Sequence, residues 1–452
     1  GALTGPVPPK SVFSPIPLLE AQPRRRPLAV SGDRAPRVNI WQIGCQMNVA
    51  DADALAEQFA EVGMVPGVDL ENADLAVLVT CAVRQHAEDR ASSHLGELAA
   101  WKAARPGRAI ALTGCMVGEH GGQLLRRFRH LDYVFDMRDP DGFFARLRDL
   151  YQGALEGPVP LPASDRLLAY LPVILGCNEM CTYCIVPFVR GRERSRPAAE
   201  VEGECRRLVG RGVKEVTLLG QNVNSYSDPT EGAGLPELMA RLDGIPGLER
   251  LRFLTSHPRN ASDRLLGAIG DLRSACEQLH LPVQSGSDDC LRRMKREYRV
   301  DEYLGILERA RRRVPGIGLS TDVIVGFCGE SEAEFQQTMR MLALVEFDTV
   351  HVQAYSPRPG TAAYRRADDI PLETKKRRLH EVLELQRGIS QRRNRALVGE
   401  GVEVLVEGHG DDGRPYGRTR QNRVTWLQRQ AVTGETVTAT VVAATAWQLV
   451  AA

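Results

Sequence analysis

Residues 176–184, GCNEMCTYC, set Cys177, Cys181 and Cys184 at a CxxxCxxC spacing. No further cysteine or histidine lies within the next twenty residues. A structural zinc ion normally takes four protein ligands, so a zinc knuckle is the weaker interpretation of this run. An iron–sulfur cube held by three cysteines keeps one iron open to a small molecule. The spacing therefore predicts redox chemistry at an open-iron cluster.

This spacing resembles the signature of the radical S-adenosylmethionine (SAM) superfamily. The resemblance implies that the amino and carboxylate groups of SAM fill the open iron position. It also implies that one electron from the cluster cleaves SAM to a 5′-deoxyadenosyl radical. Cys177, Cys181 and Cys184 are then both the metal ligands and the catalytic residues.

Three more cysteines end segments that are expected to form short buried strands, residues 38–45, 73–81 and 108–115. Successive cysteines are 36 and 34 residues apart, about the length of one βαβ unit. In a doubly wound parallel sheet the carboxyl ends of the strands share one edge. A single buried cysteine is usually a small apolar filler. Cys45, Cys81 and Cys115 together favour a second open-iron cluster at that edge.

Residues 151–165 are rich in glycine and proline and are expected to form a linker. After them, strand and helix patterns alternate six times, which predicts a parallel partial (β/α)6 barrel with active residues in the loops after the strands. A barrel of fewer than eight units stays open on one side, which suits a large substrate. The expected strands are residues 171–175, 215–219, 250–255, 278–282, 318–325 and 349–355.

The composition is that of a soluble globular protein with two or three domains: 452 residues, 43% hydrophobic, 25% charged and a net charge of +1. No apolar run approaches the roughly 18 residues that span a bilayer. Residues 1–36 are rich in proline and arginine, lack a secretory signal, and are expected to be a disordered tail. Ten cysteines without such a signal indicate metal binding or catalysis in the cytoplasm rather than disulfides.

From about Val38 to its C-terminus the chain resembles the MiaB-type tRNA methylthiotransferases, a radical SAM family. Departures from the family pattern are mild: Val79 precedes Thr80-Cys81, Ala52-Asp53 replaces Ser-Glu, and Cys328 replaces proline. None removes a candidate cluster ligand. The matching segments are residues 44–48, 80–81, 114–115, 176–196, 216–226, 279–294, 321–330 and 355–360.

This resemblance implies an auxiliary [4Fe–4S] cluster on Cys45, Cys81 and Cys115 and a radical SAM [4Fe–4S] cluster on the CxxxCxxC cysteines. SAM would serve as methyl donor and as radical source. The implied reaction adds a methylthio group to C2 of N6-isopentenyladenosine beside the tRNA anticodon. The expected domains are a methylthiotransferase domain (37–150), the linker, a radical SAM core (166–395) and a TRAM-like β-barrel that binds RNA (396–452).

Polar loops after the second and fourth barrel strands are candidates for SAM contacts. They contain Gly220, Gln221 and Asn222, and then Gln284 and Ser285 followed by Gly286 and Ser287. The alternative for each glycine is a tight turn. Four arginines lie on alternate positions after the CxxxCxxC segment and are expected to face solvent, RNA phosphate or the SAM carboxylate: Arg190, Arg192, Arg194 and Arg196. His257 is expected to pack or to form hydrogen bonds rather than to carry protons.

Basic residues near the C-terminus favour RNA binding. The helical stretch 373–395 has eight lysines and arginines against three glutamates, a balance of +5. Residues 413–429 hold five arginines and no acid, with Tyr416 and Trp426 available for stacking. Short strands are expected at 402–406, 423–427 and 435–442. Four remaining cysteines are expected to be inert packing residues: Cys205, Cys276, Cys290 and Cys328.

The expected partners are the tRNA anticodon stem-loop, an electron donor such as flavodoxin or ferredoxin, and a sulfur source, with the chain itself a monomer. Two alternatives stay within the family: methylthiolation of threonylcarbamoyl-adenosine in tRNA, or of an aspartate in a ribosomal protein. A third, from another class, is a non-catalytic iron–sulfur regulator that binds RNA.

Overall fold

The computed structural model describes residues 15–21, 34–83, 85–118, 121–151, 154–155, 157–161 and 166–452. The chain divides into two compact units. The first runs up to residue 164 and includes residues 175–179 and 184–193. The second comprises residues 165–174, 180–183 and 194–452. The CxxxCxxC segment therefore contributes to both units, which are described separately below.

A six-stranded sheet forms the centre of the first unit, in the order β1-β6-β5-β4-β2-β3. All neighbouring pairs are parallel except β1 with β6. The expected doubly wound parallel sheet is therefore confirmed, with one antiparallel edge strand. The strands are β1 (Leu19–Glu20), β2 (Arg37–Gln42), β3 (Val65–Pro66), β4 (Leu75–Thr80), β5 (Ala109–Gly114) and β6 (Tyr133–Val134).

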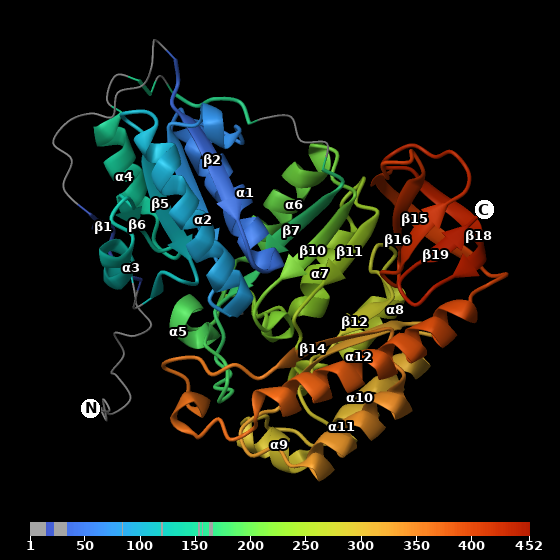
Figure 1. Cartoon of the computed structure of the whole chain (residues 1–452). Coiled ribbons are helices and arrows are strands. Elements are labelled where there is room, and N and C mark those ends of the chain that lie inside the picture. Colours follow the sequence, from blue (N-terminus) through green and yellow to red (C-terminus); the bar gives the residue numbers. More distant parts are fainter. Residues whose placement is uncertain are drawn as a thin grey trace. The chain divides into compact units, whose positions relative to one another are not determined.

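Helices cover both faces of this sheet (Figure 1). On one face Phe59 of α1 and Phe143 of α4 pack against the strands, and on the other face Leu95 of α2 and Leu124 of α3 do so. Since β4 is covered on both sides, all six of its residues are buried. The helices are α1 (Gln46–Glu61), α2 (Gln85–Ala103), α3 (Gly121–Arg127), α4 (Asp141–Leu150) and the short α5 (Val186–Arg190).

Part of the N-terminal segment belongs to this unit, which corrects the expectation of a disordered tail through residue 36. Leu19 and Glu20 pair with β6, and the Ile16 amide donates to the Asp136 carboxylate at 3.2 Å. Ile16 and Leu19 also pack against the apolar core beneath α2 and α3. The correction concerns residues 15–21, while residues 1–14 and 22–33 lie outside the described part of the chain.

Six parallel strands of the second unit confirm the expected partial barrel. They form two three-stranded sheets, β11-β10-β7 and β12-β13-β14, which a parallel bridge from Leu251 to Ala275 connects. The strands are β7 (Leu168–Pro172), β10 (Glu215–Leu219), β11 (Arg250–Phe253), β12 (Gln278–His280), β13 (Gly318–Val325) and β14 (Thr349–Ala354). A short pair, β8 (Ile174–Leu175) and β9 (Arg194–Ser195), flanks the CxxxCxxC segment.

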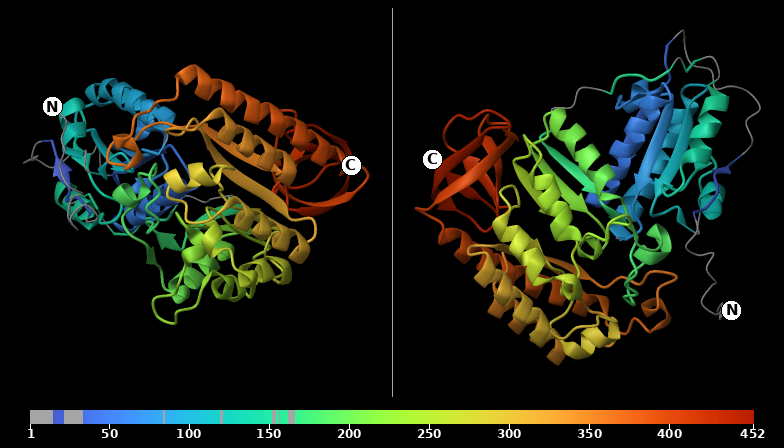
Figure 2. Two further views of the ribbon diagram at one scale, coloured as in Figure 1. Left: turned by 90° about the horizontal axis from the view of Figure 1, so that it is seen from below. Right: turned by 180° about the vertical axis from the view of Figure 1, so that it is seen from behind.

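Helices pack against the strands of this partial barrel. The long α12 lies along β14 and ends beside the C-terminal barrel, where the Asn394 amide donates to the Thr445 carbonyl at 2.9 Å (Figure 2). The α-helices are α6 (Ala198–Gly210), α7 (Leu235–Asp243), α8 (Asp263–Asp271), α9 (Asp288–Arg293), α10 (Val300–Arg313), α11 (Glu332–Val345) and α12 (Leu372–Arg395). Short 3-10 turns occur in this unit at η4 (Val223–Ser225), η5 (Pro258–Asn260) and η6 (Ala363–Arg365), and in the first unit at η2 (Leu70–Asn72).

A closed five-stranded barrel ends the chain, as expected for a small β-barrel. Val404, Val406, Leu427 and Val437 fill its interior. Sequence patterns predicted three of its strands and missed two: β16, whose sequence PYGRT has no apolar run, and β19, which has only three residues. The strands are β15 (Gly401–His409), β16 (Pro415–Thr419), β17 (Val424–Leu427), β18 (Thr436–Ala444) and β19 (Leu449–Ala451).

Buried arginines connect this C-terminal barrel to the partial barrel, and both belong to the second compact unit. From β11, the Arg250 guanidinium donates to the Arg418 carbonyl at 2.6 Å, and that of Arg252 donates to the Thr419 carbonyl at 2.9 Å. Arg252 also pairs with Glu215 at 2.8 Å. Because these cations are buried, their multiple acceptors are what make the junction stable.

No helix in the described ranges is long and apolar enough to cross a membrane.

Candidate functional site

The three N-terminal cysteines lie at one edge of the first unit's sheet, as the sequence predicted. Cys81 and Cys115 directly follow the parallel neighbours β4 and β5, and Cys45 is the N-cap residue of α1 after β2. Burial raises the pKa of the Cys115 thiol to about 11, and the nearby Cys81 and Cys45 thiols contribute to that rise. Three thiols at one sheet edge, two of them close enough to raise the pKa of the third, are a donor set that fits an iron–sulfur cluster.

Gly44 allows the Cys45 loop to approach Cys81. Its φ is +131°, a conformation that side chains other than glycine's rarely adopt. A Cβ atom built on Gly44 would lie 2.6 Å from the Cβ of Cys81. Only glycine therefore fits between the two cysteines without moving the loop.

Arg190 is the buried cation of this site. Its Nε donates to the Cys115 Sγ at 3.3 Å, and its Nη2 donates to the Asp51 carboxylate at 2.6 Å and the Asn48 side-chain oxygen at 3.1 Å. Burial disfavours the charge, but Asp51 and Cys115 hold the pKa of Arg190 above its ordinary value. Arg190 is therefore not the solvated residue of the first alternative, because it is buried and its partners are a cysteine, an asparagine and an aspartate.

The other three arginines of that series differ from Arg190. Arg192 and Arg194 are exposed. Arg196 donates to the Pro172 carbonyl at 2.9 Å and pairs with Glu204 at 2.7 Å, so it connects β7 with α6. The alternation in sequence thus reflects three different environments, not one RNA-binding face.

Cys177 begins the CxxxCxxC segment at a forced turn. The preceding Gly176 has a φ of +79°, and a Cβ on it would lie 2.2 Å from the Arg192 carbonyl oxygen. The Cys177 amide donates to the Gly191 carbonyl at 3.1 Å. The segment is therefore folded back on the chain that follows it, which fixes the backbone at Cys177.

Cys181 has a buried arginine beside it in the second unit. Arg296 Nη1 donates to the Cys181 Sγ at 3.6 Å, while its other nitrogens donate to the Pro282 carbonyl at 2.8 Å and the Tyr298 hydroxyl at 2.9 Å. The next residue, Thr182, donates its amide to the Met294 carbonyl. Sequence reasoning missed Arg296, because it lies 115 residues from Cys181 and no local pattern distinguishes it.

Asn222 is the strongest candidate for a cofactor contact. Only 2% of its surface is exposed, and neither its side-chain oxygen nor its side-chain nitrogen has a hydrogen-bond partner in the described structure. Such unpaired buried amides are costly unless a ligand satisfies them. The hydroxyl of Ser256, in the loop after β11, is unpaired in the same way and was not predicted. These polar groups fit a polar ligand such as SAM.

Two of the remaining loop candidates, Gly220 and Ser285, have structural roles. A Cβ on Gly220 would lie 2.4 Å from the Ile174 side chain, so this glycine is required by packing. The Ser285 hydroxyl accepts from the Ser287 amide and contacts the Thr338 hydroxyl. Its hydrogen bonds are therefore made within the protein. Gln284 has a φ of +74° and pairs through its backbone with β13. A backbone conformation of this kind is strained and is often found at ligand-binding loops. The last candidate, Gln221, is partly buried.

His257 and the four remaining cysteines behave as predicted. The His257 ring accepts from the Arg259 amide, and burial together with Arg296 and Arg259 lowers its pKa to about 3, so it stays neutral. The four cysteines expected to be packing residues are buried: Cys205, Cys276, Cys290 and Cys328.

Most of the basic residues near the C-terminus form internal ion pairs. In α12, Lys375 pairs with Asp368 and Arg378 with Glu330. In the C-terminal barrel, the side chains that sequence reasoning assigned to RNA pair within the chain, namely Arg418 with Glu407, Arg420 with Glu277, and Arg423 with Asp348.

The two aromatic residues expected to stack on RNA also have partners within the barrel. The Trp426 ring lies between Tyr416 and the Arg414 guanidinium and donates to Gln448. Trp447, in the turn between β18 and β19, has 70% of its surface exposed. Among the described residues of this barrel, Trp447 is therefore the exposed aromatic side chain that could stack on a base, and the sequence analysis did not single it out.

Three family models match the chain. They are the uncharacterized protein family UPF0004 over residues 37–136, the radical SAM superfamily over residues 171–342, and the TRAM domain over residues 395–451. The first covers the sheet that carries Cys45, Cys81 and Cys115, and the second begins just before Cys177.

Several curated proteins similar to the chain carry the name tRNA-2-methylthio-N(6)-dimethylallyladenosine synthase. One from Clostridium botulinum is 37% identical, covering 91% of this chain and 95% of that protein. One from Moorella thermoacetica is 40% identical, covering 91% and 96%. Among solved structures, the radical SAM methyltransferase TsrM from Kitasatospora setae superposes with a TM-score of 0.56 at 13% identity, over 73% of this chain and 77% of that chain. That likeness concerns the fold alone.

The ion pair of Arg190 yields a prediction. Arg190→Met should lower the free energy of unfolding of the first unit by about 3 kcal/mol, because it leaves Asp51 buried without its cation. Arg190→Lys should restore part of the loss. Thermal unfolding measures this, with Arg194→Met as the matched exposed control, for which we expect no change. Equal midpoints for the Arg190→Met and Arg194→Met proteins would contradict the assignment.

A second prediction concerns Asn222. Asn222→Ala should raise the Kd for SAM about fivefold, because a hydrogen bond to a buried amide contributes about 1 kcal/mol. Equilibrium binding of SAM to the cluster-loaded protein measures it. Ser285→Ala is the control, and its Kd should stay unchanged since that hydroxyl is used inside its loop. If the two variants weaken SAM binding equally, Asn222 has no special role.

Proposed function

The chain belongs to the family of tRNA-2-methylthio-N(6)-dimethylallyladenosine synthases, and we propose that it inserts a methylthio group at C2 of N6-isopentenyladenosine beside the anticodon of tRNA. The observation that carries this proposal is the convergence of Cys45, Cys81 and Cys115 at one sheet edge, in a chain that also has the CxxxCxxC segment. Radical cleavage of SAM needs only the latter. A second trio of thiols supports a reaction that also handles sulfur.

Two [4Fe–4S] clusters are part of the proposal. Cys177, Cys181 and Cys184 would hold the radical SAM cluster, and the N-terminal trio would hold the auxiliary one. When bound, the clusters and SAM supply an electron, a 5′-deoxyadenosyl radical, a methyl group and a site for sulfur. Each trio leaves one iron without a protein ligand, which is the position that a substrate or sulfur atom needs.

Each cysteine trio has one buried arginine within hydrogen-bond distance of a sulfur atom. Arg190 donates to Cys115, and Arg296 donates to Cys181. Donors to ligand sulfur stabilise the negative charge of a thiolate-bound cluster and orient the ligand. We assign these two arginines to positioning Cys115 and Cys181, because each is fixed in turn by an aspartate or by backbone carbonyls.

Loops after the barrel strands would hold SAM. The unpaired Asn222 amide and Ser256 hydroxyl follow β10 and β11, where parallel barrels place their active residues. Gln284, in a strained conformation after β12, lies at the corresponding end of the next strand. Polar side chains at these strand ends would bind and orient the cofactor.

The C-terminal barrel would bind tRNA through Trp447 and the exposed Arg429. Trp447 offers an open ring for base stacking, and Arg429 has no ion pair among the described residues. The target adenine must leave the anticodon stack to be modified, at the modest cost of base extrusion. The reaction also needs an electron donor, such as flavodoxin or ferredoxin, and a source of sulfur. We propose that the protein acts as a monomer in the cytoplasm.

The two cysteine trios should fail in different ways when mutated. Cys177→Ala should abolish cleavage of SAM to 5′-deoxyadenosine under anaerobic, reducing conditions. Cys45→Ala should retain cleavage but produce no 2-methylthio product in tRNA, as measured by mass spectrometry of nucleosides. Iron should fall from about eight to about four per chain in either variant, by loss of one cube. Cys205→Ala, a buried cysteine outside both trios, should keep both activities. Loss of both activities in the Cys45→Ala protein would refute this division of roles.

Stacking on Trp447 is tested by binding. Trp447→Ala should weaken the affinity for an anticodon stem-loop about tenfold, because stacking of one base contributes about 1 to 3 kcal/mol. Val432→Ala is the matched control, since Val432 is an equally exposed apolar residue of the same barrel. Equal affinities for the two variants, measured at one stated salt concentration, would show that the Trp447 surface does not hold RNA.

A further inference from the structure

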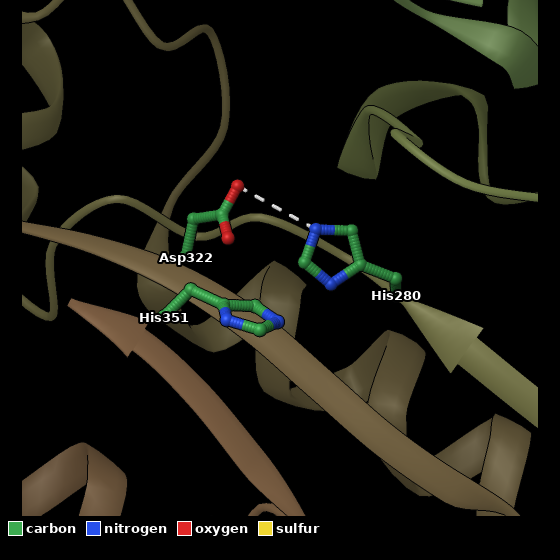
Figure 3. A group of neighbouring side chains, drawn as sticks. All are labelled: His280, Asp322 and His351. Carbon is green, nitrogen blue, oxygen red and sulfur yellow. Dashed lines mark ion pairs between the residues drawn. The ribbon is translucent and has the colours of Figure 1, made fainter. Parts of the chain in front are cut away.

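Three side chains of the partial barrel converge outside both cysteine trios. His280 ends β12, Asp322 lies in β13 and His351 lies in β14, three adjacent parallel strands of the second unit. The strand register pairs Asp322 with His351 and places His280 opposite Ser320. Figure 3 shows the three side chains pointing toward one another.

The side chains lie on the strand face that is turned away from the helices. In β13, Thr321 and Val323 on either side of Asp322 are fully buried, and Val323 belongs to the main apolar core with α10 and α11. Alternation along a strand therefore puts Asp322 on the opposite, concave face of the partial barrel. The Asp322 side chain is 37% exposed and that of His280 is 11% exposed, so a small ion can reach them.

The distances suit a metal ion. One ligand atom from each residue can be chosen so that all lie within 4.8 Å of one another, and the His280 Nε2 is 3.5 Å from the Asp322 Oδ2. Ligands around tetrahedral zinc at 2.0–2.1 Å are about 3.3 Å apart. The pair of His280 and Asp322 is thus nearly at the required spacing, and the His351 ring lies beside that of His280, with the ring centroids 5.7 Å apart.

Ser320 orients the first of these ligands. The His280 Nδ1 lies 3.0 Å from the Ser320 Oγ. In the tautomer whose Nδ1–H donates to that hydroxyl, the Nε2 lone pair is directed toward Asp322. Histidines that bind metals are held in this way, because their second ring nitrogen donates to a neighbouring oxygen.

We infer that His280, Asp322 and His351 form a binding site for a divalent transition-metal ion such as Zn²⁺, separate from the iron–sulfur sites and beyond the proposed methylthiolation. Two imidazoles and one carboxylate select zinc, iron or cobalt over magnesium and calcium, which prefer all-oxygen sites. Three protein ligands leave at least one coordination position open. The bound ion faces the interior of the partial barrel, where that position holds water or an oxygen atom of a ligand.

Zinc binding to the full-length protein with both clusters loaded tests this site. The protein is dialysed anaerobically against micromolar Zn²⁺, and bound zinc and iron are measured by mass spectrometry. We expect about one zinc per chain, unchanged iron, and at least a tenfold loss of zinc affinity in His351→Phe and in Asp322→Asn. His380→Ala, which removes an exposed histidine of α12, should bind zinc like the unaltered protein.

Thermal unfolding gives a second measurement. A ligand that binds only the folded state raises its melting temperature, so zinc should raise the Tm of the unaltered and His380→Ala proteins and leave that of His351→Phe unchanged. His351 is exposed, so this variant should fold even if Asp322→Asn does not. No zinc bound by the unaltered protein, or equal zinc in all variants, overturns the site. Neither result bears on the cysteine trios, whose iron content is measured in the same samples.

Discussion

Parallel pairing of β4 with β2 and β5 places the carboxyl ends of three strands side by side, and the chain has a cysteine at or just after each of those ends. The sheet is stable because both of its faces are covered by helices, which makes the fully buried β4 its centre. Three cysteines that are dispersed over 70 residues of sequence, Cys45, Cys81 and Cys115, are thereby brought to one sheet edge without any long loop. The close approach of Gly44 to Cys81 completes it.

Buried arginines perform the same structural task at several places in this chain. Arg190 connects Cys115 to Asp51, Arg296 connects Cys181 to the loop after β12, and Arg252 joins β11 to the C-terminal barrel. A buried guanidinium is stable only when most of its donors are satisfied, and its planar fork reaches several acceptors at once. The cysteine sulfurs gain hydrogen-bond donors from residues that also hold the fold together.

Internal pairing also changes the meaning of the basic C-terminal region. The excess of positive charge in α12 and the C-terminal barrel is largely paired with carboxylates of the same unit, including Glu277, Glu330 and Asp348. Arginine and lysine side chains that are already paired with carboxylates contribute little to the binding of phosphate. In the proposed function, recognition of RNA by this barrel depends more on the exposed ring of Trp447 and on Arg429 than on overall charge.

The sequence alone determined the features that local patterns encode: the two cysteine trios, the doubly wound sheet, the partial barrel and the bounds of β10 and β13, which agree with the predicted segments. Buried parallel strands are continuous apolar runs, so they are recognisable from sequence. Only the tertiary structure decided which polar side chains meet. Arg190 and Cys115 are 75 residues apart, and His280, Asp322 and His351 come from three strands. Such contacts depend on strand order and register, which leave no periodic signal in the chain.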